Sequence, residues 1–182
     1  MTESKENSNR ESAMRDGTVL ALLWIVTFTL STVMLKSVNN DYSIVASLGT
    51  MALTMMSPFV VYKLSLKHRN NERNGTMTYS EAWLYIFTMY LCAIILSSIA
   101  QYIFYAYIDP DIFAGVIPEF EKLAITNGLD AESIKIFTGT FEMLDKMSAG
   151  EIVLSQMSGH ITRTIVLTSL IALAIKKKPA YK

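Results

Sequence analysis

Four apolar runs separated by polar segments dominate the hydropathy pattern of this chain. The first, residues 17–35, has nineteen residues without a charge. At a rise of about 1.5 Å per residue, such a helix spans about 28 Å, close to the hydrocarbon thickness of a bilayer. Similar runs follow later in the chain. We predict four transmembrane helices, over residues 17–35, 44–62, 82–108 and 151–176, and therefore an all-α membrane protein.

The segments outside these runs are polar and differ in composition. Residues 1–16 contain almost no large apolar side chain, so we predict a disordered tail. Residues 63–81 are polar and basic and should form a surface loop with Asn74-Gly75 as its turn. Asn39-Asn40-Asp41 predicts a turn between the first two spans, and residues 177–182 form a short basic tail.

The distribution of lysine and arginine predicts the orientation of the spans. With the N-terminus inside, the two tails and loop 63–81 carry eleven of these residues, and the segments outside carry four. The remaining one, Arg163, falls within the fourth span. This bias predicts that both termini lie in the cytoplasm and that residues 109–150 lie on the opposite side.

The outer segment 109–150 holds eight acidic residues and three lysines, and its pattern predicts two short helices. Pro118 is typical of a first helical turn, and Asn127-Gly128 resembles a helix end. Asp130 resembles the N-cap of a second helix with an apolar stripe. That stripe is expected to pack within the hairpin or on the membrane rather than form a partner groove, and it consists of Ile134, Phe137, Phe141 and Leu144.

Composition excludes several classes of function. Hydrophobic residues make up 51% of the chain, and the formal net charge is zero, which gives no basic surface for nucleic acid. The single cysteine, Cys92, rules out a disulfide within one chain, and His68 and His160 are expected at different depths, so we expect no metal site. No catalytic or cofactor-binding motif occurs, and we therefore expect neither a cofactor nor enzymatic activity.

A few polar side chains within the predicted spans are candidates for function. Arg163 lies beyond the midplane toward the outer side, where an unpaired charge is expensive. We expect it to be held inside the helix bundle by Gln101, a serine hydroxyl and backbone carbonyls; snorkelling toward water and contact with a ligand are the alternatives. Glu81 is expected to interact with a helix N-terminus. The candidate polar cluster is Ser97, Ser98, Gln101, Tyr105, Gln156, His160 and Arg163.

The third span carries two recognisable sequence motifs. Residues 78–83 (TYSEAW) open it, and residues 102–111 (YIFYAYIDPD) close it. Together with the acidic loop and the last span ending in AIKKK, they resemble the bacterial inner-membrane family catalogued as domain of unknown function 4199, over roughly residues 17–178. The resemblance implies four spans in a bacterial cytoplasmic membrane. It implies no activity and no catalytic residues.

Two hypotheses of function follow. The first is a non-enzymatic structural or partner-binding component of the cell envelope whose outer loop, 109–150, contacts another protein. The alternative is a transporter or channel component in which Arg163 and its polar neighbours line a site. The lipid bilayer is the expected surrounding in both, and both leave a homo-oligomer open.

Overall fold

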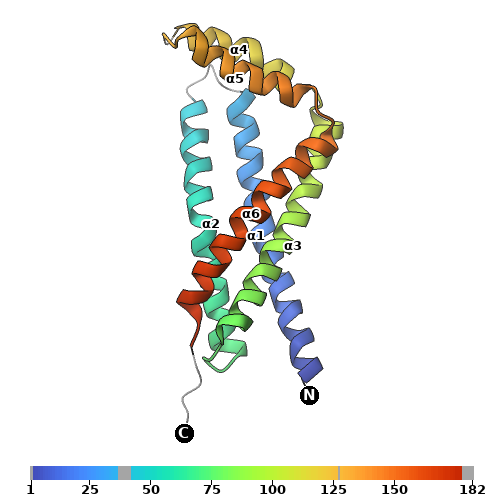
Figure 1. Ribbon diagram of the computed structural model, residues 1–182, viewed down its shortest axis with the longest axis vertical. Coiled ribbons are helices and arrows are strands. Elements are labelled where there is room, and N and C mark those ends of the chain that lie inside the picture. Colours follow the sequence, from blue (N-terminus) through green and yellow to red (C-terminus); the bar gives the residue numbers. More distant parts are fainter. Residues whose placement is uncertain (1, 37–41, 127, 178–182) are drawn as a thin grey trace. The chain divides into compact units, whose positions relative to one another are not determined.

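The apolar runs form helices, since only helices and closed barrels satisfy their backbone groups in lipid. The computed structural model describes residues 2–36, 42–126 and 128–177, without the side chains of 2–7 and 42–46. In these ranges every named element is a helix, with no named strand (Figure 1). The elements are α1 (Thr2–Lys36), α2 (Tyr42–Glu72), α3 (Tyr79–Ile103), the π-helix η1 (Phe104–Ile108), α4 (Ile112–Thr126), α5 (Ala131–Asp145) and α6 (Ala149–Ile175).

Three of the described helical stretches are long and apolar enough to cross a membrane: Ser8–Lys36, Tyr79–Ile108 and Ala149–Ile175. They contain the first and third predicted spans and all but the last residue of the fourth, and they indicate a membrane protein. The all-helical prediction is confirmed. The chain divides into two units. The first unit comprises residues 1–24, 53–97 and 157–182, and the second comprises 25–52 and 98–156.

The core of the first unit is formed by α1, α2, α3 and α6. Small residues allow close helix packing there: a Cβ atom on Gly17 would lie 2.7 Å from both Cys92 Cβ and the Met89 carbonyl oxygen. Beyond the helices, Met77 and Lys177 exchange two backbone hydrogen bonds. The largest fully buried side chains of this core are Leu20, Val61, Ile86, Met89, Tyr90 and Ile175.

The prediction that residues 1–16 form a disordered tail differs from the structure. Helix α1 begins at Thr2 and continues without a break into the apolar run. Ser12, Ala13 and Asp16 are all buried. These residues recur at three- and four-residue spacing, so they lie on one face of the helix and pack against α2 and α3. Tertiary contacts therefore order a segment whose composition alone predicts disorder.

The predicted surface loop 63–81 is also shorter in the structure. Helix α2 continues past the apolar run to Glu72, because Val61, Ser65 and His68 extend one buried face beyond it. The turn prediction for Asn74-Gly75 is confirmed. Both residues have positive φ, at 52° and 76°, and the Gly75 amide donates to the Arg69 carbonyl. The predicted turn at residues 39–41 lies outside the described residues.

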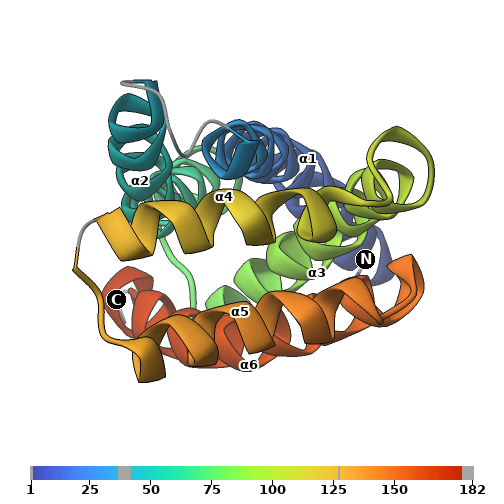
Figure 2. The ribbon, with the colours of Figure 1, turned by 90° about the horizontal axis from the view of Figure 1, so that it is seen from above.

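In the second unit, α4 and α5 lie side by side as a helical hairpin (Figure 2). The prediction of two short helices in this segment is confirmed. The Asp130 carboxylate accepts from the Ser133 amide at 2.8 Å and caps α5 as predicted, which lowers the pKa of Asp130. Gly128, with φ at 72°, follows the end of α4; its neighbour Asn127 lies outside the described residues.

The prediction for Pro118 was wrong, because this residue lies inside α4 rather than in its first turn. Helix α4 begins earlier than expected, and its first residues, Ile112, Phe113 and Val116, are buried. Phe120 of α4 contacts Phe137 and Phe141 of α5, with ring centroids 5.5 and 5.8 Å apart. The phenylalanine stripe therefore packs within the hairpin, as expected.

Two spans begin with the same reciprocal cap. At the start of α3, Glu81 accepts from the Thr78 amide at 2.8 Å, while Thr78 Oγ1 accepts from the Glu81 amide. Ser148 and Glu151 make the equivalent pair at the start of α6. Such capping boxes satisfy amides that the helix leaves without partners. The prediction that Glu81 interacts with a helix N-terminus is confirmed.

Candidate functional site

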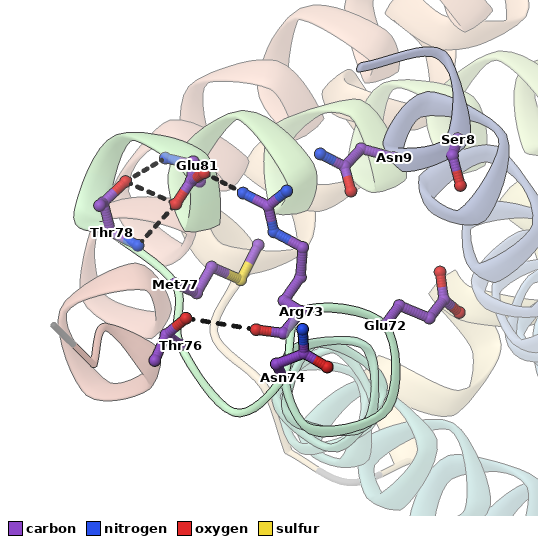
Figure 3. Close-up of a pocket in the computed structure, with 9 residues that line it drawn as sticks. All are labelled: Ser8, Asn9, Glu72, Arg73, Asn74, Thr76, Met77, Thr78 and Glu81. Carbon is purple, nitrogen blue, oxygen red and sulfur yellow. Dashed lines mark hydrogen bonds and ion pairs between the residues drawn. The ribbon is translucent and has the colours of Figure 1, made fainter. Parts of the chain in front are cut away.

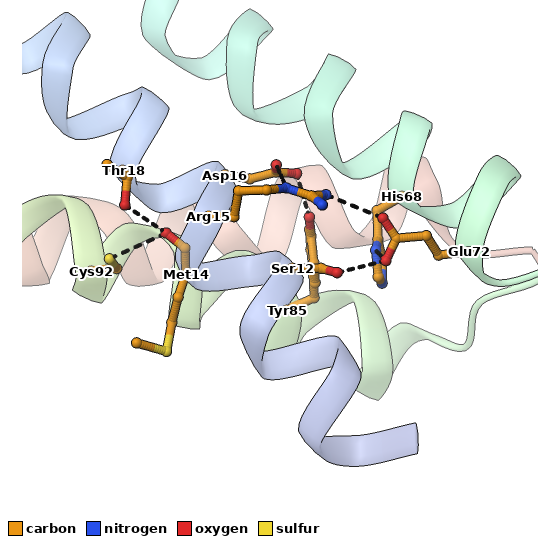
Figure 4. Close-up of polar contacts among 9 residues, drawn as sticks. All are labelled: Ser12, Met14, Arg15, Asp16, Thr18, His68, Glu72, Tyr85 and Cys92. Atoms are coloured by element: carbon orange, nitrogen blue, oxygen red, sulfur yellow. Dashed lines mark hydrogen bonds and ion pairs between the residues drawn. The ribbon is translucent and has the colours of Figure 1, made fainter. Parts of the chain in front are cut away.

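A polar network connects α1, α2 and α3 within the first unit (Figure 4). Helix α1 contributes Ser12, Arg15 and Asp16, which lie just before the apolar run. Helix α2 contributes His68 and Glu72 from its extension beyond the predicted second span, and α3 contributes Tyr85. Ion pairs and hydrogen bonds join these six side chains.

His68 lies at the centre of this network and is fully buried, with 1% of its side chain exposed. Its ring stacks on the ring of Tyr85, with centroids 4.0 Å apart and an interplanar angle of 9°. Nδ1 lies 3.1 Å from Glu72 Oε2, in a geometry that makes an electrostatic contact rather than a hydrogen bond. Nε2 has no hydrogen-bond partner among the described residues. Burial lowers the pKa of His68, and nearby Glu72 only partly offsets this effect.

Glu72 attaches α1 to α2. Its Oε2 accepts a hydrogen bond of 2.6 Å from the Ser12 hydroxyl, and its Oε1 lies 3.2 Å from Arg15 Nη2. The Ser12 hydrogen bond is the largest of the effects that lower the pKa of Glu72. On the other side, Tyr85 donates a hydrogen bond of 2.6 Å to Asp16 Oδ2. Two carboxylates thus hold residues 12–16 of α1 against two helices.

A pocket of about 450 Å³ adjoins the network (Figure 3). Glu72 lines it from α2, Ser8 and Asn9 line it from α1, and the turn between α2 and α3 completes it. The carboxylates that face the pocket already have partners: Glu81 pairs with Arg73, and Glu72 pairs with Arg15. A small polar molecule could bind in the pocket only by competing with these two ion pairs.

The second unit has a different arrangement around the π-helix η1. Tyr105 is buried, and its hydroxyl accepts a hydrogen bond from Gln156 Nε2 at 3.3 Å. The Tyr105 ring packs against Phe28 and Phe113, with centroids 5.7 Å away in both cases. Just after η1, Asp109 forms an ion pair with Lys36 at the end of α1. The π-helix, a form often found at functional sites, falls within the motif at residues 102–111.

The structure brings some residues of the predicted intramembrane cluster together. Tyr105 and Gln156 are in contact, as described above. Ser97, Ser98 and Gln101 are buried, which agrees with a polar face of α3 turned toward protein. His160 stacks on Trp24 at 5.0 Å within the first unit.

Arg163 has a different environment from the one predicted. It is exposed, and its Nε donates to the carbonyl of Gly159 in the same helix at 3.2 Å. Gly159 has no side chain there, and its ideal Cβ position lies 3.9 Å from Arg163 Nη2. The guanidinium therefore bonds to the backbone of its own helix. Pairing with Gln101 stays a prediction.

Sequence reasoning missed the network around His68 completely. Tyr85, which falls within the predicted third span, is buried. A helical spacing signal was present, since Ser65, His68 and Glu72 fall on one face that continues from Val61. The described residues contain no group of three His, Cys, Asp or Glu side chains that could hold a metal ion.

A family model described as "Protein of unknown function (DUF4199)" matches residues 15–177. The chain belongs to this family. The match includes Arg15, Asp16, His68, Glu72 and Tyr85, so most of the network lies within the DUF4199 region. No curated protein and no solved structure matches the chain. For this DUF4199 protein, any function must be inferred from the side chains themselves.

Proposed function

We propose that this protein is a four-span component of the bacterial cytoplasmic membrane with both termini in the cytoplasm. The second span would be formed by α2. This helix exposes large apolar side chains along its length, which lipid would cover at no cost. The cation bias of eleven to four supports the orientation. The apolar side chains that α2 exposes include Leu48, Met51, Met55 and Phe59.

Cysteine labelling in intact cells tests this topology. The background variant is Cys92→Ser, because a serine can still donate to the Met14 carbonyl that Cys92 Sγ contacts. Cysteines introduced as Ser4→Cys and Lys182→Cys should resist an impermeant thiol reagent, and Glu132→Cys should react. Reaction at only one terminus would indicate three spans, and reaction at both would reverse the orientation.

The proposed role is non-enzymatic: the α4–α5 hairpin binds a partner protein outside the membrane. The observation that carries this role is an apolar pair on the outward face of α5. Ile136 and Met143 are 63% and 58% exposed. Their seven-residue spacing places them on one side of the helix, opposite Thr138, which is buried. Exposed apolar side chains on a folded hairpin favour a binding surface.

The charge around this surface favours a basic partner. Residues 109–150 carry eight acidic side chains and three lysines, a net charge of −5. Glu132 lies one helical turn before Ile136 and shares its face. An anionic lipid surface would be repelled by these charges, whereas a lysine- or arginine-rich amphipathic segment would meet both the apolar pair and the carboxylates.

Site-specific photo-cross-linking in cells tests the partner role. A cross-linking amino acid at Ile136 or Met143 should join the full-length protein to one partner, at a peptide rich in lysine or arginine. Glu132→Lys should lower the yield at least fivefold. Glu142→Lys makes the same charge change about 120° around the helix from Ile136 and about 100° from Met143, and should have a smaller effect.

Several outcomes would overturn the partner role. Products that contain only lipid, or that map to an acidic or uncharged peptide, would contradict it. Equal effects of Glu132→Lys and Glu142→Lys would show that the partner is attracted by the general negative charge and not by a specific contact at this face. A substrate flux that depends on Arg163, with no cross-linked partner, would instead favour a transporter.

A further inference from the structure

His68 is the one histidine in the network, and its surroundings favour its uncharged form. Nδ1 faces the Glu72 carboxylate at 3.1 Å, which favours placing the single ring proton there. Nε2 then carries a lone pair and lies in a fully buried position with no described partner. A second proton would have to go on Nε2, where it finds no acceptor among the described residues. A buried donor of this kind is costly.

The charged and titratable groups around His68 come from each helix of the network. Helix α2 contributes Glu72 and Arg73, α1 contributes Arg15 and Asp16, and α3 contributes Tyr85. Burial is the largest effect and disfavours a proton on His68, as does Arg73; together they outweigh Glu72 and Asp16, which favour it. The closed network therefore holds His68 neutral.

The groups that enclose His68 are the same groups that attach α1. Glu72 binds Ser12 and Arg15, and Tyr85, which stacks on His68, binds Asp16. Glu72 and Tyr85 both contact the imidazole, so a movement of either one exposes it to water. Such a movement breaks the contacts that hold Ser12, Arg15 and Asp16 of α1.

We propose that His68 makes this network a proton switch: acidification of the adjacent aqueous phase releases residues 8–16 of α1 from Glu72 and Tyr85. An open state in which water reaches His68 binds the proton more tightly than the closed state. Acid therefore shifts the equilibrium toward the open state. The open-to-closed ratio can rise by about tenfold for each unit by which the pKa of His68 differs between the states. The proposal is independent of the partner role of α4 and α5.

Spin-label mobility in lipid nanodiscs tests the switch on the full chain. The label is attached through Glu11→Cys, an exposed position of α1, in the Cys92→Ser background. Between about pH 8 and about pH 5.5, the range in which histidine titrates, the mobile fraction should rise severalfold and reversibly. In His68→Phe, which retains a ring to stack on Tyr85, the label should stay immobile throughout.

The second histidine of the chain, His160, provides a control for His68. His160→Gln should keep the acid response of the parent protein. If His68→Phe does not fold, His68→Gln provides a second non-titrating variant. If neither His68 variant folds, the titrations of the parent protein and of His160→Gln decide between the outcomes. No change in the parent protein, an unchanged response in either His68 variant, or loss of the response in His160→Gln would overturn the switch.

Discussion

In the first unit charged and polar groups help to attach α1, whereas around η1 in the second unit the contacts are mainly between aromatic rings. Asp16 and Glu72 accept short hydrogen bonds of 2.6 Å from Tyr85 and Ser12. Around η1, Tyr105 packs among phenylalanine rings and accepts one hydrogen bond of 3.3 Å. Ring packing tolerates small displacements, but a buried carboxylate that loses its donor is strongly penalised. The first unit should therefore respond more sharply to single substitutions and to pH.

The largest expected difference is between two glycines. Gly17→Ala places a Cβ 2.7 Å from Cys92 Cβ and the Met89 carbonyl, and should destabilise the protein by about 1–3 kcal/mol. Gly139→Ala in α5 meets nothing within 4 Å and should stabilise that helix by up to about 1 kcal/mol. Thermal unfolding in detergent measures both. Equal effects would show that α1 and α3 do not pack closely.

Two tyrosine hydroxyls give the next contrast. Tyr85→Phe removes the hydroxyl that donates to Oδ2 of the buried Asp16 carboxylate and should cost about 1–3 kcal/mol. Tyr105→Phe removes a long contact with the Gln156 amide and should cost less than about 1 kcal/mol. The same unfolding assay ranks the two. A larger loss at Tyr105 would reverse the comparison.

Acid should weaken the first unit. Burial lowers the pKa of His68 in the folded state, so below its ordinary value of 6.5 the unfolded chain binds the proton more tightly, and stability falls as pH falls. The pKa of Glu72 is also lowered, which adds a further loss below its ordinary value of 4.5. Unfolding temperatures at about pH 7.5 and about pH 5.5 measure the first effect. His68→Phe should be nearly insensitive over this interval; an equal drop there would assign the effect to other groups.

The smallest predicted effect is local to the second unit. Asp130→Ala removes the cap of α5 and should speed amide exchange in its first turn, most clearly at Ser133. Asp145→Ala, at the other end of α5, makes the same change in charge and should leave that turn unchanged. Hydrogen exchange read by mass spectrometry distinguishes them. Slower exchange after Asp130→Ala would contradict the cap.

Features encoded in a few adjacent residues could be predicted from the sequence. The Asp130 cap, the Asn74-Gly75 turn and the role of Glu81 depend on contacts between residues no more than six positions apart. The His68 network could not, because Asp16 and Tyr85 are 69 positions apart and Ser12 and Glu72 are 60 apart. By their composition, residues 1–16 are too polar to fold alone. It cannot show that α2 and α3 supply the partners for that segment.

A double-mutant cycle between Asp16 and Tyr85 tests most directly whether polar contacts hold α1 in the first unit. Asp16→Asn, Tyr85→Phe and the double variant are compared with the parent protein by unfolding in detergent. The hydrogen bond of 2.6 Å predicts a coupling free energy above about 1 kcal/mol, with the double variant losing less stability than the two single losses combined. Additive losses, within about 0.3 kcal/mol, would contradict the contact and with it the attachment of α1.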